Sequence, residues 1–61
     1  MNYDEAKAKW DGDTSRKSFW FNARDLGCSH EEAVIYAVTN KLPQHAKEEI
    51  EYRLSLAGGE L

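Results

Sequence analysis

Apolar residues recur at helical spacing in four stretches of the chain, and polar or glycine-containing segments separate them. The first stretch runs from about Tyr3 to Trp10, and Tyr3, Ala6 and Trp10 share one face of the predicted helix. Asn2 is a suitable N-cap, and Glu5 three residues later completes a pair typical of a capping box. The Asp-Gly-Asp sequence that follows predicts the end of this helix, because these residues favour turns.

A second helix is predicted over residues 16–26, where the apolar positions again fall on one face. Its stripe consists of Phe19, Ala23 and Leu26. Thr14 or Ser15 can cap its start, since a hydroxyl accepts a hydrogen bond from a free amide of the first turn. Gly27 follows directly, where a helix that ends in a left-handed residue favours glycine.

The third helix has the clearest start signal. Ser29 and Glu32 form an S-x-x-E capping box, and Cys28 just before it can pack on the first apolar residue of the helix. Residues 33–38 are apolar nearly all round, so we expect this helix to be central and the most buried. Asn40 is a suitable left-handed terminator.

A fourth helix is predicted from Pro43, which suits a first helical turn, to about Leu56, with Gly58-Gly59 ending it. Its expected buried stripe consists of Ala46, Ile50, Leu54 and Ala57. No stretch alternates with the period of two that is typical of a strand. We therefore expect an all-α fold, a small three- to four-helix bundle, in which residues 1–61 form a single helical domain.

Length and cysteine content limit how this domain can be stabilised. A chain of 61 residues is near the lower limit for folding without a staple, and its one cysteine excludes an internal disulfide. A lone thiol suits a reducing compartment. The first residues lack the features of a signal peptide, and the longest apolar run is six residues, Ala33–Val38, too short to span a bilayer. We expect a soluble, cytoplasmic protein.

Net charge bears on the class of partner. The chain carries eleven acidic and eight basic residues, a net charge of -3. Phosphate binding favours clustered lysine and arginine, so this balance argues against nucleic acid as the main ligand. It favours a protein partner, including a nucleic-acid-binding protein whose basic surface the chain could complement.

Residues with reactive side chains do not form a recognisable catalytic or metal-binding pattern. The acidic residues next to Cys28 oppose a reactive thiolate, and we interpret Cys28 as a small apolar residue before the helix. The candidate metal ligands are Cys28, His30, Glu31, Glu32 and His45. Zinc ligands usually come in paired motifs, which this spacing does not provide, and His45 stands alone. We expect no catalytic residue, no cofactor and no metal.

The aromatic run Phe19-Trp20-Phe21 indicates a binding surface. Successive helical residues point about 100° apart, so three aromatics cannot all enter one core stripe. Two arrangements would cover the aromatic rings that do not enter the core. Tyr3 and Trp10 of the first helix can pack over them, or two copies of the chain can dimerise through this aromatic helix. Exposed tryptophan beside arginine is typical of binding hot spots. The predicted partner-binding residues are Arg16, Trp20, Phe21 and Arg24.

The segment from Ala23 through Gly27 and Ala33 to Tyr36 has the spacing of a helix-turn-helix. A small residue lets the helices approach, and the glycine makes the turn. This segment resembles the helix-turn-helix of bacterial regulators, which implies DNA binding. The would-be recognition helix, however, opens with Glu31 and Glu32, which phosphates would repel. If the chain binds DNA, the candidate residues are Lys7, Lys9, Arg16, Lys17 and Arg24.

A second resemblance extends from residue 15 to residue 48. It depends on Ser15-Arg16-Lys17, Phe19-Trp20-Phe21, the run from Arg24 to Ala33, Leu42-Pro43 and Glu48. This order is similar to a helical segment that follows the catalytic domain of phage and plasmid primases. Ubiquitin-associated three-helix bundles share the same turn. The primase likeness implies an accessory helical module near replication proteins, without catalytic residues of its own.

These patterns lead to three functional hypotheses. The first is a non-catalytic helical protein-interaction module, an accessory to phage or plasmid replication proteins. The second is a small acidic phage-encoded inhibitor of a host nucleic-acid-binding enzyme. The third is a helix-turn-helix DNA-binding protein. None of the three is an enzyme.

Overall fold

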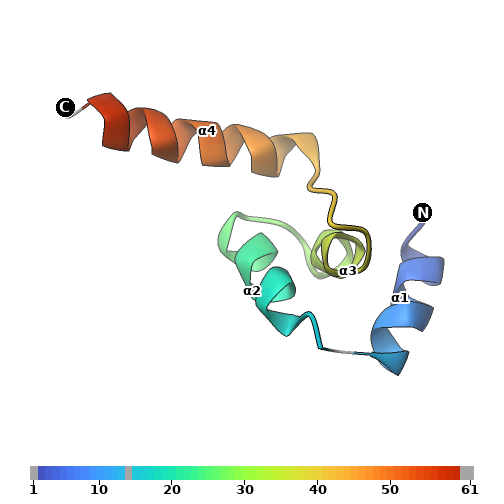
Figure 1. The fold of residues 1–61 in the computed structure, drawn as a ribbon. Helices are drawn as coiled ribbons and strands as arrows, with labels where there is room; N and C mark the ends of the chain where they lie inside the picture. The colour runs from blue at the N-terminus through green and yellow to red at the C-terminus, as the bar shows by residue number, and fades with distance from the viewer. Residues whose placement is uncertain (1, 14, 60–61) are drawn as a thin grey trace.

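The protein is all-α. A computed structural model describes residues 2–13 and 15–59, and that part of the chain contains four helices and no strand (Figure 1). The helices are α1 (Tyr3–Gly12), α2 (Lys17–Asp25), α3 (His30–Thr39) and α4 (Gln44–Gly59). The predicted fold class is confirmed. None of the helices in the described residues is both long enough and apolar enough to cross a membrane.

Helix α3 is the centre of the fold. Both α1 and α2 pack against it, and Figure 1 shows α3 end-on between them. Ala33, Val34 and Ala37 of this helix are buried, more than in any other helix. The prediction of a central third helix is confirmed, because a helix that is apolar nearly all round can be covered on several sides.

Small side chains make up most of the buried core. Its buried residues are Ala6, Ala23, Cys28, Ala33, Val34, Ala37 and Ala46. Val34 is the largest side chain that is fully buried. Larger residues surround this core only half-buried: Trp20, Leu26, Tyr36 and Leu42. The helices therefore pack by approaching each other closely at alanines, and large side chains do not fill the core.

The predicted capping residues fix most of the helix ends. The Asn2 side chain accepts from the Glu5 amide at 2.9 Å. Ser29 and Glu32 form a complete capping box, with reciprocal bonds of 3.1 and 2.9 Å. These bonds satisfy amides that have no partner within the helix.

Two residues with positive φ end helices as predicted. Gly27 has φ 91° in the turn after α2, and Asn40 has φ 61° after α3. Glycine has no Cβ to oppose this conformation, and asparagine tolerates it better than most residues. The α2–α3 turn is closed by the Cys28 amide, which donates to the Ala23 carbonyl at 3.0 Å.

The start of α2 differs from the prediction. Arg16 occupies the N-cap position and makes no side-chain capping bond, so the prediction that Ser15 caps this helix is wrong. The Ser15 amide instead donates to Asp13 Oδ1 at 2.9 Å, which gives the preceding turn its own stabilising bond. Thr14, the other predicted cap, lies outside the described residues.

Helix α4 departs most from the sequence prediction. Ala46 is buried and Ile50 is half-buried, but Leu54 is 66% exposed and Ala57 is exposed, so the predicted buried stripe is wrong in its second half. The helix also continues through Gly58 to Gly59 instead of ending near Leu56. Figure 1 shows α4 projecting past the other three helices, and the molecule measures 44 × 19 × 14 Å along its principal axes.

Candidate interaction surface

A hollow lined mainly by aromatic side chains lies where α1, α2 and the start of α3 meet. We call it the aromatic groove; its volume is about 240 Å³ and its lining residues are Trp10, Lys17, Trp20, Phe21 and His30. Trp10 and Trp20 are half-buried, whereas the Phe21 side chain is 61% exposed. The groove therefore offers an apolar surface that the protein does not cover itself.

Contacts within the groove fix the orientation of Trp20. Its indole Nε1–H donates to His30 Nδ1 at 3.3 Å, so a neutral His30 carries its own proton on Nε2. The Phe21 ring meets the Trp20 ring edge-on, with centroids 5.0 Å apart. Tyr3 approaches the His30 ring from α1 at 6.3 Å. Trp20 is thus a rigid wall of the groove, and Phe21 is the accessible ring beside it.

The predicted site residues divide between two places. The Arg24 guanidinium lies 5.9 Å from the Trp20 ring centroid and donates to the Cys28 carbonyl at 3.1 Å. Trp20, Phe21 and Arg24 are therefore brought together. Arg16 instead lies over the Phe19 ring at 5.6 Å and turns away from the groove.

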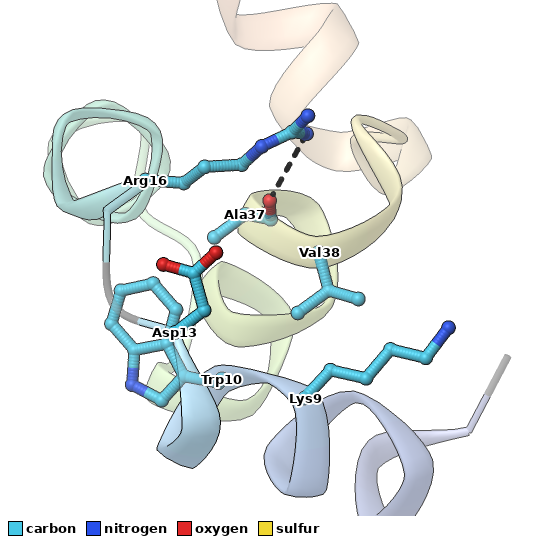
Figure 2. Close-up of a pocket in the computed structure, with 6 residues that line it drawn as sticks. All are labelled: Lys9, Trp10, Asp13, Arg16, Ala37 and Val38. Atoms are coloured by element: carbon cyan, nitrogen blue, oxygen red, sulfur yellow. Dashed lines mark hydrogen bonds between the residues drawn. The ribbon is translucent and has the colours of Figure 1, made fainter.

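Arg16 belongs to a second, more polar pocket of about 400 Å³. The pocket is lined by Lys9, Trp10, Asp13, Arg16, Ala37 and Val38. Figure 2 shows the Arg16 side chain reaching across to α3, where it donates to the Ala37 carbonyl at 3.5 Å. The Ser15 amide lowers the pKa of Asp13 below its ordinary value by donating to its carboxylate. Trp10 forms a wall of both this pocket and the aromatic groove.

The aromatic groove has three lining residues besides the predicted ones. Trp10, Lys17 and His30 line it, although the sequence analysis did not assign them to partner binding. Lys17 could have been found from its spacing, because Lys17, Trp20, Phe21 and Arg24 follow the i, i+3, i+4, i+7 pattern of one helical face. His30 could not, since only the fold brings α3 next to Trp20.

The exposed half of α4 carries three large apolar side chains. Tyr52, Leu54 and Leu56 are 59%, 66% and 55% exposed. Leu54 lies about 200° around the helix from Tyr52, whereas Leu56 is one turn beyond Tyr52 on the same side. This part of α4 is therefore apolar on two sides. Arg53 connects it to α2 by donating to the Asp25 carboxylate at 2.9 Å and to the Asp25 carbonyl at 3.1 Å.

Cys28, Glu32 and His45 form a side-chain cluster where α4 begins. His45 Nε2 lies 2.8 Å from Glu32 Oε2, so His45 does not stand alone as the sequence spacing suggested. Hydrogen bonds from the Ser29 amide and from His45 lower the pKa of Glu32. Burial, and secondly the charge of Glu32, raise the pKa of the Cys28 thiol. A buried thiol with a raised pKa is a poor nucleophile, which argues against cysteine catalysis at this cluster.

Comparisons of the chain with protein-family models, with curated proteins and with solved structures found no match. These three comparisons therefore supply no function. The surfaces of the described residues therefore carry the functional argument, and among them the aromatic groove is a mainly apolar hollow beside a largely exposed ring.

Proposed function

We propose that this chain is a non-catalytic helical protein-interaction module that accommodates an apolar side chain of its partner in the aromatic groove. The exposure of Phe21 beside the fixed ring of Trp20 carries this proposal. Aromatic residues near the centre of an interface contribute most of the binding free energy in many complexes. A domain that places alanines in its core and leaves such a ring outside has apolar area available for a partner.

Charge around the groove indicates the chemistry of the partner segment. Lys17 lines the groove, and the Arg24 guanidinium lies over the Trp20 ring. The carboxylate of Asp25, the acidic residue of α2, is already paired with Arg53. A partner segment that presents an apolar residue flanked by carboxylates therefore fits best, since opposite charges at the rim guide association and favour the correct partner.

The resemblance to the helical segment of phage and plasmid primases supports replication proteins as the class of partner. The helix-turn-helix alternative is less well supported. Helix α3, the would-be recognition helix, packs against both α1 and α2 and opens with Glu31 and Glu32. Carboxylates at this position oppose entry into the major groove, where the first residues of the helix would meet base edges between phosphates.

The decisive experiment compares two exposed apolar residues from different helices. The partner is captured from native lysate on immobilised wild-type protein and identified, and its affinity for purified variants is then measured by calorimetry. Phe21→Ala should weaken binding by at least about 2 kcal/mol, because it removes the accessible ring of the groove. Leu56→Ala is the matched control, since Leu56 is similarly exposed but lies on α4. Circular dichroism checks that both variants fold.

Four results would contradict the proposal. Full affinity of a folded Phe21→Ala variant would exclude the aromatic groove as the contact. A loss confined to Leu56→Ala would move the interface to α4. Binding to DNA that falls steeply with added salt would favour the helix-turn-helix alternative. Capture of a host nucleic-acid-binding enzyme with affinity independent of Phe21 would favour the acidic inhibitor.

A further inference from the structure

Three side chains that bind transition metals in proteins lie together at the junction of α4 with the α2–α3 turn. Cys28 comes from that turn, Glu32 from the first turn of α3 and His45 from the first turn of α4. One ligand atom from each lies within 4.8 Å of the other two. Because Glu32 and His45 are thirteen residues apart in sequence, only the fold makes them neighbours.

Hydrogen bonds hold the Glu32 side chain and the Cys28 backbone in place. Glu32 Oε1 accepts from the Ser29 amide at 2.9 Å as part of the capping box, which leaves Oε2 facing His45. The Cys28 amide donates to the Ala23 carbonyl at 3.0 Å, and its carbonyl accepts from Arg24 at 3.1 Å. Hydrogen bonds behind the ligands are what orients metal-binding residues in known sites. The side chain of His45 is half-exposed and can adjust.

We propose that Cys28, Glu32 and His45 bind a zinc ion, with water as the fourth ligand. A sulfur, an imidazole nitrogen and a carboxylate oxygen are the donors that Zn²⁺ takes in proteins, at about 2.0 to 2.3 Å. Tetrahedral geometry at those bond lengths places neighbouring ligand atoms roughly 3.3 to 3.8 Å apart. His45 Nε2 and Glu32 Oε2 lie 2.8 Å apart and no two of the three ligand atoms are more than 4.8 Å apart, so shifts of about 1 Å or less bring them into that range.

Binding at this cluster requires a defined exchange of bonds. The Cys28 thiol releases one proton to solvent and binds as the thiolate, since only the deprotonated sulfur is a ligand. His45 gives up the Nε2 proton that it shares with Glu32, which exchanges through solvent to Nδ1, and Nε2 and the Glu32 carboxylate then each form one bond to the ion. The thiol belongs to the buried core, so the ion is approached by solvent from the half-exposed side of Glu32 and His45.

A zinc ion here would fasten α4 to the rest of the domain. Helix α4 contacts the other helices through its first turns and through Arg53, and a 61-residue chain has little core to hold it. Small domains commonly add a metal or a disulfide for this reason, and the single cysteine leaves only the first of these within one chain. This inference is independent of the proposed partner binding at the aromatic groove.

Cobalt is a suitable probe, because Co²⁺ replaces Zn²⁺ and absorbs visible light. The protein is freed of metal with a chelator under reducing conditions and titrated with Co²⁺. We expect one ion per chain, a thiolate-to-cobalt charge-transfer band in the near ultraviolet, the intense visible bands of tetrahedral cobalt, and loss of all of these on addition of Zn²⁺. Zn²⁺ should also raise the midpoint of thermal unfolding.

Matched variants test each ligand against a neighbour of the same kind. Cys28→Ser and His45→Ala should each lower zinc affinity by more than about 100-fold, since even the loss of a residue behind a ligand costs about 10- to 100-fold. Glu32→Gln should weaken binding while keeping the capping box, because glutamine serves there equally. His30→Gln and Glu31→Gln are the controls and should bind zinc like the wild type.

The proposal fails if the cobalt complex lacks the thiolate band, or if His30→Gln loses as much affinity as His45→Ala. Should Cys28→Ser fail to fold because its side chain is buried, His45→Ala and Glu32→Gln still decide the outcome, since both act at partly exposed side chains. Phe21→Ala should keep full zinc affinity, so that failure of the partner-binding proposal and failure of the zinc proposal are distinguishable.

Discussion

The α2–α3 corner and the second half of α4 use apolar residues in opposite ways. In the corner, Ala23 and Ala33 have no exposed surface, and the helices approach closely. In α4, Leu54 and Leu56 are large and more than half exposed. The fold is thus stabilised where side chains are small, because burial depends on the fit between helices and not on side-chain size alone. Large apolar residues remain outside, available to another molecule.

The strongest test of this contrast places the same charge in each region. Ala33→Asp buries an unpaired carboxylate in the corner and should cost about 3 to 5 kcal/mol, most of the stability of a domain at the low end of the usual range of about 5 to 15 kcal/mol. Leu54→Asp, on the exposed half of α4, should change the free energy of unfolding by no more than about 0.5 kcal/mol. Circular dichroism during urea unfolding measures both. Equal losses would show that α4 is covered in solution, for instance by a second copy of the chain.

A second pair of variants adds volume instead of charge. Ala33→Leu should destabilise the domain by about 1 to 3 kcal/mol, because the close contact of α3 with its neighbours leaves no room for three further carbons. Ala57→Leu meets only solvent and should be nearly neutral. The urea midpoints of the two variants give the comparison. Tolerance of leucine at position 33 would mean that the corner is looser than its burial indicates.

A third pair concerns hydroxyls. Ser29→Ala removes the acceptor for the Glu32 amide at the start of α3 and should cost about 1 kcal/mol. Ser55→Ala lies inside exposed α4, where alanine has the higher helix propensity, and should be slightly stabilising. Opposite signs in thermal unfolding are therefore expected. A loss at Ser55 as large as that at Ser29 would contradict the view that α4 is free at this point.

The smallest effect is expected at the link between the two regions. Arg53 binds Asp25 on α2 and Glu49 one turn back on α4, and all three side chains are largely in contact with solvent. Arg53→Ala should lower global stability only slightly, because an exposed ion pair contributes little. Amide exchange in the second half of α4 should nevertheless accelerate. Arg53→Lys, which keeps the charge but not the planar fork, should give an intermediate rate.

Local signals in the sequence predicted the helices well. Asn2, Gly27, Ser29 and Asn40 each act within a few residues along the chain, and the structure confirms the ends they predict. The apolar segment 33–38 is also a local signal. Its run of apolar residues predicts a central helix whichever neighbouring helices cover it.

Features that depend on where helices lie in space could not be predicted this way. Leu54 lies on the same helical stripe as Ala46 and Ile50. Spacing alone cannot show that α4 has already extended beyond the other helices at the position of Leu54. The meeting of Cys28 with His45 and of Trp20 with His30 likewise joins segments that the sequence keeps apart. Spacing likewise could not show that Arg16 turns to the Ala37 carbonyl while Lys17 lines the groove.

The positive φ of Gly27 has a stereochemical consequence. An added Cβ at this residue would meet no atom within 4 Å. An L-amino acid is therefore disfavoured there by the positive φ, which L-residues rarely adopt, and not by lack of space. A D-alanine suits both the sign of φ and the open surroundings, and it would restrict the unfolded chain without straining the turn. Because Cys28 follows directly, the mirror-image residue could be introduced by joining two synthetic peptides at that cysteine.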